Sequence, residues 1–335
     1  MSAFEPIPLT SIPGFRFGHY TDPDAGTGCT AVIAPAGAVG GVDVRGAAPA
    51  SRETDLLRPE NTVEAVHAVI LSGGSAFGLE AAGGAARELE ERGIGLDVGV
   101  ARVPIVCSSC LFDLAFGRAD VRPTSAAGIL AVRDAVSREP GSALDEGNVG
   151  AGTGATVGKL NGPECCMKSG LGARAFRIGP LMVGAVCAVN AVGNVIDPAT
   201  QEPIAGMRAT ADGTTIIDME GAMLAAAEQV TMPLDRTNTT ISCIVTNARL
   251  TKAQATKVAQ MAADAYAHAI RPTHTSNDGD TIYVLASGDL DAEASASLPI
   301  DLIGLAATRA LEAAIVAGCT EAENAGGLPA HRDLA

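Results

Sequence analysis

The first part of the chain shows the apolar pattern of β-strands. From residue 14 onward, apolar side chains either alternate with polar ones or gather in short runs, as at Cys29–Ala34 and Val39–Val44. Charged and turn-forming residues are then frequent at 45–58, where we expect a loop. The chain therefore opens with β structure.

Helical spacing dominates the next part. Apolar residues recur every three or four positions over Asn61–Val69, Ala76–Arg92 and Thr124–Glu139, and Gly73-Gly74-Ser75 separates the first two stretches. This spacing predicts three helices after the strands.

The middle of the chain returns to β structure. Two strands are predicted within Phe176–Ile196, around the turn at Gly179-Pro180, and the more polar stretch 199–236 is typical of an exposed linker with helical parts. The densest run of glycine, Gly147–Gly158, precedes these strands and permits a close approach of the backbone to a ligand.

From Thr239 the predicted elements alternate between strand and helix. Strands are expected at Thr239–Thr246 and Asp280–Ser287, and an apolar helix at Ile300–Ala317. Between the strands, Thr251 begins a helix with a capping box, which runs until Pro272. The remaining residues, 326–335, form a polar tail that we expect to be loosely held. The whole order predicts layered α and β structure.

Composition narrows the kind of packing. The 335 residues include 47% apolar but only 3% aromatic side chains, no Trp and 39 Gly. Ala, Val, Ile and Leu must fill the interior, which requires closely packed layers. At roughly 100–200 residues per domain, the length allows one large domain or two medium ones.

Charge excludes several classes of partner. The formal net charge is −15, from 38 acidic and 23 basic residues, so no basic surface is expected for nucleic acid or anionic lipid. Lysine occurs only at positions 159, 168, 252 and 257. A lysine within an apolar or glycine-rich stretch, such as Lys159, is therefore informative.

The sequence predicts a cytoplasmic protein without a membrane span. Glu5 and two early prolines stand where a signal peptide has a basic and then an apolar region. The stretch Leu181–Ile196 contains Asn190 and Asn194 and is shorter than the ~18 apolar residues of a span. In this setting we expect the eight cysteines to be buried, reduced thiols.

Several short motifs are incomplete. Gly73–Phe77 lacks the second glycine of a nucleophile elbow, and Gly147–Lys159 lacks the positions that define a P-loop or a dinucleotide fingerprint. Cys107-Ser108-Ser109-Cys110 has redox spacing without the βαβ pattern of a thioredoxin. We expect structural thiols there, and no cofactor.

Metal binding has weak support in the sequence. His268, His274, Asp278 and Asp280 offer nitrogen and oxygen ligands, but their spacing follows no named metal motif. We expect no metal, and a metal-dependent hydrolase is the weakest alternative.

The tripeptide Asn238-Thr239-Thr240 allows a sharper hypothesis. A threonine between linker and strand becomes an N-terminal nucleophile if the 238/239 bond is cut. Its α-amino group, with a reference pKa near ~7.7 to 8.0, then serves as the base. The tripeptide also fits a glycosylation sequon, which has no expected consequence without a secretory signal. A β-branched pair at the start of a strand is ordinary, so from these residues alone the nucleophile is only one option.

Longer blocks carry a resemblance to a known family. Gly41–Gly46, Arg52–Leu57, Gly73–Leu79 and Asn238–Ile241, together with Gly18-His19, are similar to the self-processing family of D-aminopeptidase/esterases, β-aminopeptidases and nylon-oligomer hydrolases. The blocks span nearly the whole chain in the family's order, and their detail is nearest to the nylon-oligomer hydrolases.

The resemblance implies a fold and a processing event. We expect a four-layer αββα sandwich of the N-terminal-nucleophile hydrolase kind, of class α/β (α+β). It forms one domain, 1–335, that cuts itself into an α part, 1–238, and a β part, 239–335. The family implies a homo-oligomer, a tetramer of these cut pairs.

The resemblance also assigns roles to single residues. Thr239 matches the nucleophile, Asn190 the donor to the oxyanion, Lys159 the lysine near the nucleophile, and Asp278 and Asp280 the paired aspartates of the nylon-oligomer hydrolases.

Two substrate positions depart from the family pattern. Phe112 replaces a tyrosine, and Cys110 stands where aminopeptidases place an acid for the substrate amine. Both favour internal amide bonds or uncharged substrates, although Asp113 is another carboxylate nearby.

The expected function is therefore a self-cleaving amide hydrolase without a cofactor. Its substrates are short peptides or amide oligomers such as those of 6-aminohexanoate. An aminopeptidase of broad specificity is the alternative within the same chemistry, and an uncut, non-catalytic binding protein is the alternative from another class.

Overall fold

The computed structural model of the protein describes residues 4–227 and 238–334. The last part of the predicted linker, 228–236, lies outside the described residues. Its first part holds the short strand β14 (Pro203–Ala205) and the helix α3 (Met219–Ala227), whose exposed Leu224 agrees with a surface location.

Ten of the described strands form a hydrogen-bonded sheet that is folded into two layers. The order across it is β1 (Glu5–Ile7), β11 (Leu171–Ile178), β12 (Leu181–Asn190), β15 (Thr239–Thr246), β17 (Thr281–Ala286), β3 (Thr27–Val44), β5 (Val66–Ser72), β8 (Val106–Cys110) and β4 (Ala50–Arg52), and β2 (Arg16–Asp22) also pairs with β3. The long strand β3 connects the layers, since its second half pairs with β17 and its first half with β2 and β5.

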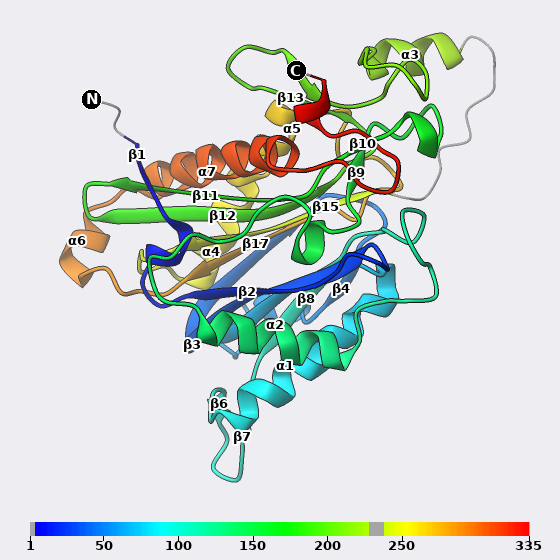
Figure 1. The fold of residues 1–335 in the computed structure, drawn as a ribbon. Coiled ribbons are helices and arrows are strands. Elements are labelled where there is room, and N and C mark those ends of the chain that lie inside the picture. The colour runs from blue at the N-terminus through cyan, green and yellow to red at the C-terminus, as the bar shows by residue number, and fades with distance from the viewer. Residues whose placement is uncertain (1–3, 228–237, 335) are drawn as a thin grey trace.

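Helices cover both outer faces of the folded sheet (Figure 1). On one side α4 (Lys252–Ala262), α5 (Asp264–Ala269) and α7 (Ile300–Thr320) pack on the layer of β12, β15 and β17. On the other side α1 (Glu80–Glu91) and α2 (Ser125–Ser137) pack on the layer of β2, β3 and β5. This arrangement confirms the predicted αββα sandwich.

Smaller elements decorate the sandwich. They are the strand pairs β6 (Leu96–Asp97) with β7 (Arg102–Val103) and β9 (Thr156–Val157) with β10 (Met167–Lys168), the strands β13 (Asn194–Ile196) and β16 (Ile270–Arg271) beside β14, and the helix α6 (Ala292–Ala296).

The apolar core lies in three levels that follow the layers. Between the sheet layers, Phe17 and Leu71 meet Ile241 and Cys243, and the other clusters lie under the helices on each side. Small residues allow the close spacing that the composition predicts. A Cβ on Gly84 of α1 would lie 1.8 Å from a backbone oxygen of α2, for example, so these helices touch through their backbones.

Several predictions agree with these elements, and one helix prediction is wrong. The helices expected at Ala76–Arg92 and Thr124–Glu139 correspond to α1 and α2, and the capping box of Thr251 with Gln254 is present. The helix expected at Asn61–Val69 is instead partly loop and partly β5, all of whose residues are buried. A strand buried on both faces carries a continuous apolar run, which spacing alone does not distinguish from a buried helix.

The C-terminal prediction also needs correction. The tail expected to be loosely held contains the buried Ala330 and a short 3-10 helix, His331–Asp333. It is attached to the body by a hydrogen bond of 2.9 Å from the amide nitrogen of Lys168 to the carbonyl oxygen of Pro329.

The longest of the described helices, α7, belongs to the core. α7 is long and apolar enough to cross a membrane by length and composition, but 67% of its apolar window is buried inside the structure. Its residues Ile303, Leu311 and Ile315 pack with the sheet.

All eight cysteines lie in the described part of the chain, and all are buried free thiols, as expected. Cys107 and Cys110 are on β8, which follows β5 and α1 in a parallel β-α-β unit. The local sequence did not indicate that unit. Burial raises the pKa of the Cys107 thiol to about 12, which suits a structural role.

Candidate active site

Three neighbouring strands bring the predicted residues to one edge of the sheet. Thr239 is the first residue of β15 and pairs with Asn190, the last residue of the antiparallel strand β12. The parallel strand β17 begins at Thr281, directly after Asp278 and Asp280. Because β12 ends where β15 and β17 begin, these side chains meet although they are distant in sequence.

The Thr239 hydroxyl lies against the peptide bond that precedes it. Its Oγ1 donates a hydrogen bond to the carbonyl oxygen of Asn238 and accepts one of 3.1 Å from the amide nitrogen of Gly279. A Cβ on Gly279 would lie 2.9 Å from this Oγ1. The 278–280 turn therefore approaches the hydroxyl closely because residue 279 has no side chain.

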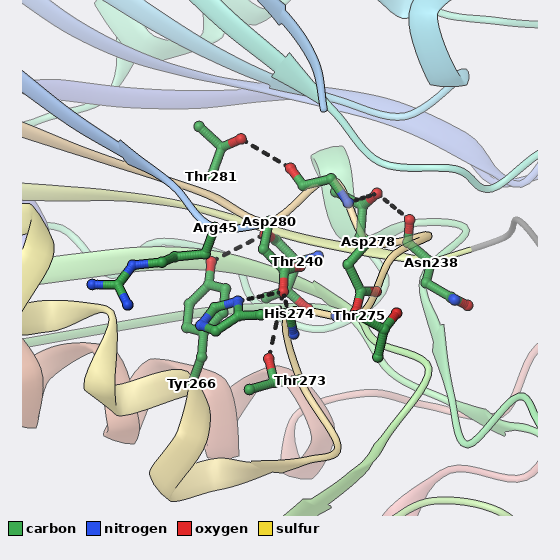
Figure 2. A network of polar contacts seen from close by, with 12 residues as sticks. Arg45, Asn238, Thr240, Tyr266, Thr273, His274, Thr275, Asp278, Asp280 and Thr281 are labelled. Atoms are coloured by element: carbon green, nitrogen blue, oxygen red, sulfur yellow. Dashed lines mark hydrogen bonds and ion pairs between the residues drawn. The ribbon is translucent and has the colours of Figure 1, made fainter. Parts of the chain in front are cut away.

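Asp280 holds the start of β15 (Figure 2). Its Oδ1 accepts a hydrogen bond of 2.7 Å from the amide nitrogen of Thr240. Its Oδ2 accepts from His274, at 3.1 Å from the amide nitrogen and 2.9 Å from Nδ1. His274 has a φ of 56°, which is rare for a residue with a side chain and is often found at functional sites.

The second carboxylate has a different environment. Asp278 Oδ2 accepts a hydrogen bond of 2.6 Å from the amide nitrogen of Thr275, whereas its Oδ1 is buried with no hydrogen-bond partner among the described residues. Burial, together with the negative charge of Asp280, raises the pKa of Asp278 to about 6. Asp278 is therefore the carboxyl group of the pair that is best suited to exchange a proton near neutral pH.

Asn190 is held from both ends of its side-chain amide. Its Nδ2 donates to the carbonyl oxygen of Phe112 at 2.9 Å. Its Oδ1 accepts from the amide nitrogen of Thr156 at 3.1 Å and from Lys159 Nζ at 2.7 Å. These partners fix which end of the amide is the donor.

Lys159 is half-buried at the edge of a cavity. Burial lowers the pKa of Lys159 to about 8, although nearby acidic groups, Asp278 and Asp113 among them, oppose this shift. The ammonium thus interacts electrostatically with both carboxyl groups and donates to the Asn190 amide oxygen.

Thr239 opens into a cavity of about 430 Å³, called here the nucleophile cavity. It is lined by Ala48, Ala50, Ser75, Cys110, Phe112, Asn238, Thr239, Ser276 and Asn277. The structure therefore places both proposed substrate positions, Cys110 and Phe112, beside Thr239. None of the nine lining residues is acidic or basic.

A second cavity of about 430 Å³ borders Lys159 and is called here the lysine cavity. It is lined by Phe112, Asp113, Ala115, Phe116, Gly154, Thr156, Lys159, Pro163, Glu164, Cys166, Ala211, Asp212, Gly326, Gly327 and Leu328. Phe112 belongs to both linings, so the two cavities adjoin at this residue.

Several backbone contacts that support the 278–280 turn were not predicted from the sequence. The amide nitrogens of Arg45 and Gly46 both donate to the carbonyl oxygen of Asp280, at 3.0 and 3.3 Å. A Cβ on Gly46 would lie 2.2 Å from the carbonyl oxygen of Asp278, so this block needs glycine. In the sequence, only the glycines in Gly41–Gly46 and Asn277–Asp280 indicate such a close approach. The fold shows that the two segments touch.

The fold pairs His268 with a residue other than those considered with it for metal binding. His274 bonds to Asp280, but His268 forms its own pair with Glu312, at 2.6 Å from Nδ1 to Oε1. Over residues 4–227 and 238–334, no three side chains of His, Cys, Asp or Glu gather as ligands.

Solved structures with the same architecture define the class of protein. A β-aminopeptidase from Burkholderia sp. superimposes with a TM-score of 0.67 at 20% identity, over 98% of this chain and 92% of that one. The L-aminopeptidase D-Ala-esterase/amidase from Ochrobactrum anthropi, described as a variant of the Ntn hydrolase fold, gives 0.66 at 17% identity over 97% and 89%. This chain therefore has the N-terminal-nucleophile hydrolase fold.

Sequence comparison identifies the family. Residues 8–332 match Peptidase family S58. An uncharacterized aminopeptidase from Mycobacterium leprae is 40% identical over 347 residues, which cover 96% of this chain and 92% of the relative. A 6-aminohexanoate-oligomer endohydrolase from Agromyces sp. is 32% identical over 285 residues, which cover 83% and 74%. The chain belongs to Peptidase family S58 and is a hydrolase of amide bonds.

Proposed function

We propose that this hydrolase cuts its own chain between Asn238 and Thr239 and then uses Thr239 as its N-terminal nucleophile. The observation that carries the proposal is the position of Thr239 Oγ1, which bonds to the Asn238 carbonyl while Gly279 approaches it at 3.1 Å. The hydroxyl needed for attack is thus already beside the peptide bond to be broken.

The proposed cut proceeds through an ester. Thr239 Oγ1 attacks the carbonyl carbon of Asn238 and loses its proton, for which Asp278 is the candidate acceptor. The carbon–nitrogen bond breaks, and the nitrogen of Thr239 takes a proton and leaves as an amine. Water then hydrolyses the ester, which returns the hydroxyl to Thr239 and ends the α part with the Asn238 carboxylate.

The mature site would use the same groups on a substrate. The freed amine of Thr239 takes the proton of its own hydroxyl as this oxygen attacks the substrate carbonyl. Asn190 Nδ2 donates to the oxyanion that forms, and the Lys159 ammonium adds positive charge beside Asn190. Asp280 keeps the start of β15, and with it Thr239, in position.

The substrates proposed are short peptides or amide oligomers, including oligomers of 6-aminohexanoate. The uncharged lining of the nucleophile cavity supports this choice, because it offers no carboxylate for a substrate amine at Cys110. Aminopeptidase activity is the second candidate, favoured by the relatives that carry that name at 40% identity. Hydrolysis of an aminoacyl p-nitroanilide that is lost after acetylation of its amine would support the second candidate.

Substitution of Thr239 tests the proposal. Thr239→Ala removes the hydroxyl and should leave one uncut, inactive chain on a denaturing gel. Thr239→Ser is the matched control, since it keeps a hydroxyl and should still be cut. Two fragments from the alanine variant would refute the proposal, and an active enzyme that is never cut would refute the self-cleavage step.

A further inference from the structure

The C-terminal turn forms part of the wall of the lysine cavity. Gly326, Gly327 and the half-buried Leu328 line this cavity. Ala325 and Leu328 exchange backbone hydrogen bonds of 3.2 and 3.0 Å across the two glycines. The φ angles of Gly326 and Gly327, 60° and 79°, are those of a tight two-residue turn.

This turn is attached to the body of the protein on both sides. Before it, the side-chain amide of Asn148 exchanges hydrogen bonds of 2.8 and 3.2 Å with the backbone of Glu323. After it, the carbonyl oxygen of Pro329 accepts from Lys168, and His331 Nδ1 lies 2.8 Å from the carbonyl oxygen of Ile204. Leu328 is therefore presented at a fixed place. Figure 1 shows the red C-terminal segment beside β10, which contains Lys168.

The aromatic ring beside the turn lies next to a buried lysine. Lys168 is fully buried, and its Nζ donates to the carbonyl oxygens of Gly152 and Ala155 at 3.1 and 3.0 Å. The same ammonium lies 5.3 Å from the ring centroid of Phe116. A Cβ on Gly326 would lie 2.8 Å from an edge carbon of this ring. Phe116 thus lies next to both the buried Lys168 and the turn.

The lysine cavity leads to the candidate nucleophile. Lys159 lines the cavity and bonds to Asn190, which is the strand partner of Thr239. Phe112 lines both cavities, and its carbonyl oxygen accepts from Asn190. An amide held at Thr239 in the nucleophile cavity therefore has a second cavity next to it, on the side of Lys159.

We propose that the lysine cavity holds the unbranched aliphatic segment on one side of the amide that is cut, and that Leu328 sets how long this segment is. The inference rests on the proposed function of Thr239. Phe112, Phe116 and Leu328 give the cavity apolar surfaces suited to methylene groups, while its charged lining residues are Asp113, Lys159, Glu164 and Asp212. Pockets of this volume commonly bind small molecules through such linings.

Substrate series of increasing length test this assignment. The probes are linear aliphatic amides in two series, one with a longer acyl part and one with a longer amine part. The readout is the ratio of kcat/KM for the longest member to that for the shortest. Leu328→Trp should lower this ratio ~10-fold in one series, because a pocket that loses room for methylenes discriminates by about this much. Leu328→Ala should raise the ratio in the same series.

Two controls keep the test decisive. Leu305→Trp replaces a leucine of α7 that is 47% exposed and should leave both ratios unchanged. Thermal unfolding would reveal whether Leu328→Trp impairs folding. In that case Leu328→Ala still tests the assignment. Ratios that do not move in either series, with an active parent enzyme, would overturn the assignment. A parent that neither cuts itself nor hydrolyses the shortest amides would instead overturn the proposed function.

Discussion

Asp280 Oδ1 lies 2.7 Å from the amide nitrogen of Thr240, one residue after the proposed nucleophile. The same carboxylate binds His274 through its other oxygen. It thereby connects the start of β15 to the 273–280 segment, and both of its oxygens are occupied by donors. We infer that Asp280 positions Thr239 and that Asp278 exchanges the proton.

Asp280→Asn should slow self-cleavage. An amide side chain keeps only one acceptor oxygen, so either the Thr240 or the His274 contact is lost. Hydrogen bonds to a charged group contribute about 1.5–3 kcal/mol, so the rate should fall ~10- to 100-fold. Band densities on a time-resolved gel measure the rate. The exposed Asp264→Asn is the matched control, and equal rates in both variants would refute the positioning role.

The rate of self-cleavage should depend on pH in a bell shape. It rises as the Asp278 carboxyl loses its proton, around the raised pKa of about 6, and falls as Lys159 loses its proton, around the lowered pKa of about 8. Chain made by cell-free synthesis and shifted into buffers across this range measures the profile.

The acid limb of this profile has its own check. In Asp280→Asn the limb should move to lower pH, because the negative charge that helps to raise the pKa of Asp278 is gone. A limb that stays in place would contradict the assignment of the proton acceptor to Asp278.

Gly279→Ala should also slow the cut. The added Cβ would lie 2.9 Å from Thr239 Oγ1 and 3.0 Å from the carbonyl oxygen of Ala48, so the turn or the hydroxyl must shift. Misplacement of a reacting group by about 1 Å can cost ~10²-fold in rate. Gly83→Ala in α1, whose Cβ would meet only an arginine nitrogen at 3.8 Å, is the control. Similar rates in both variants would show that the close approach is unimportant.

Asn190→Asp removes the hydrogen-bond donor of this side chain and keeps its acceptor oxygen. The carboxylate still accepts from Thr156 and Lys159 but offers no hydrogen to an oxyanion. The loss of one such donor should lower kcat ~10²- to 10³-fold, measured on enzyme that has already been cut. The exposed Asn324→Asp should retain the parent kcat. An undiminished kcat for Asn190→Asp would remove Asn190 from the proposed mechanism.

Local sequence patterns predicted the type of an element better than they predicted what packs around it. Helix α1 and strand β15 follow from spacing and β-branched residues, but β5 resembled a helix because both of its faces are buried. Polar and apolar residues alternate along β15, yet all of its residues are buried. On its more polar face, Ser242 meets the Tyr266 hydroxyl at 3.1 Å.

The proposed site residues were predicted from the resemblance to a family. Their contacts with one another became clear only from the fold. Thr240 and Asp280 are 40 positions apart and meet because β15 and β17 are parallel neighbours. The roles of Gly46 and Gly279 depend on backbone approach across such neighbours. Likewise, the polar composition of 326–335 did not reveal that Gly326–Leu328 line a cavity.

The intact mass spectrum of the purified protein tests the central claim most directly. Self-cleavage at the proposed bond predicts two polypeptides with the masses of residues 1–238 and 239–335, and Edman sequencing of the smaller should begin Thr-Thr-Ile-Ser. One polypeptide with the mass of the full chain, or fragments that begin elsewhere than Thr239, would contradict the claim.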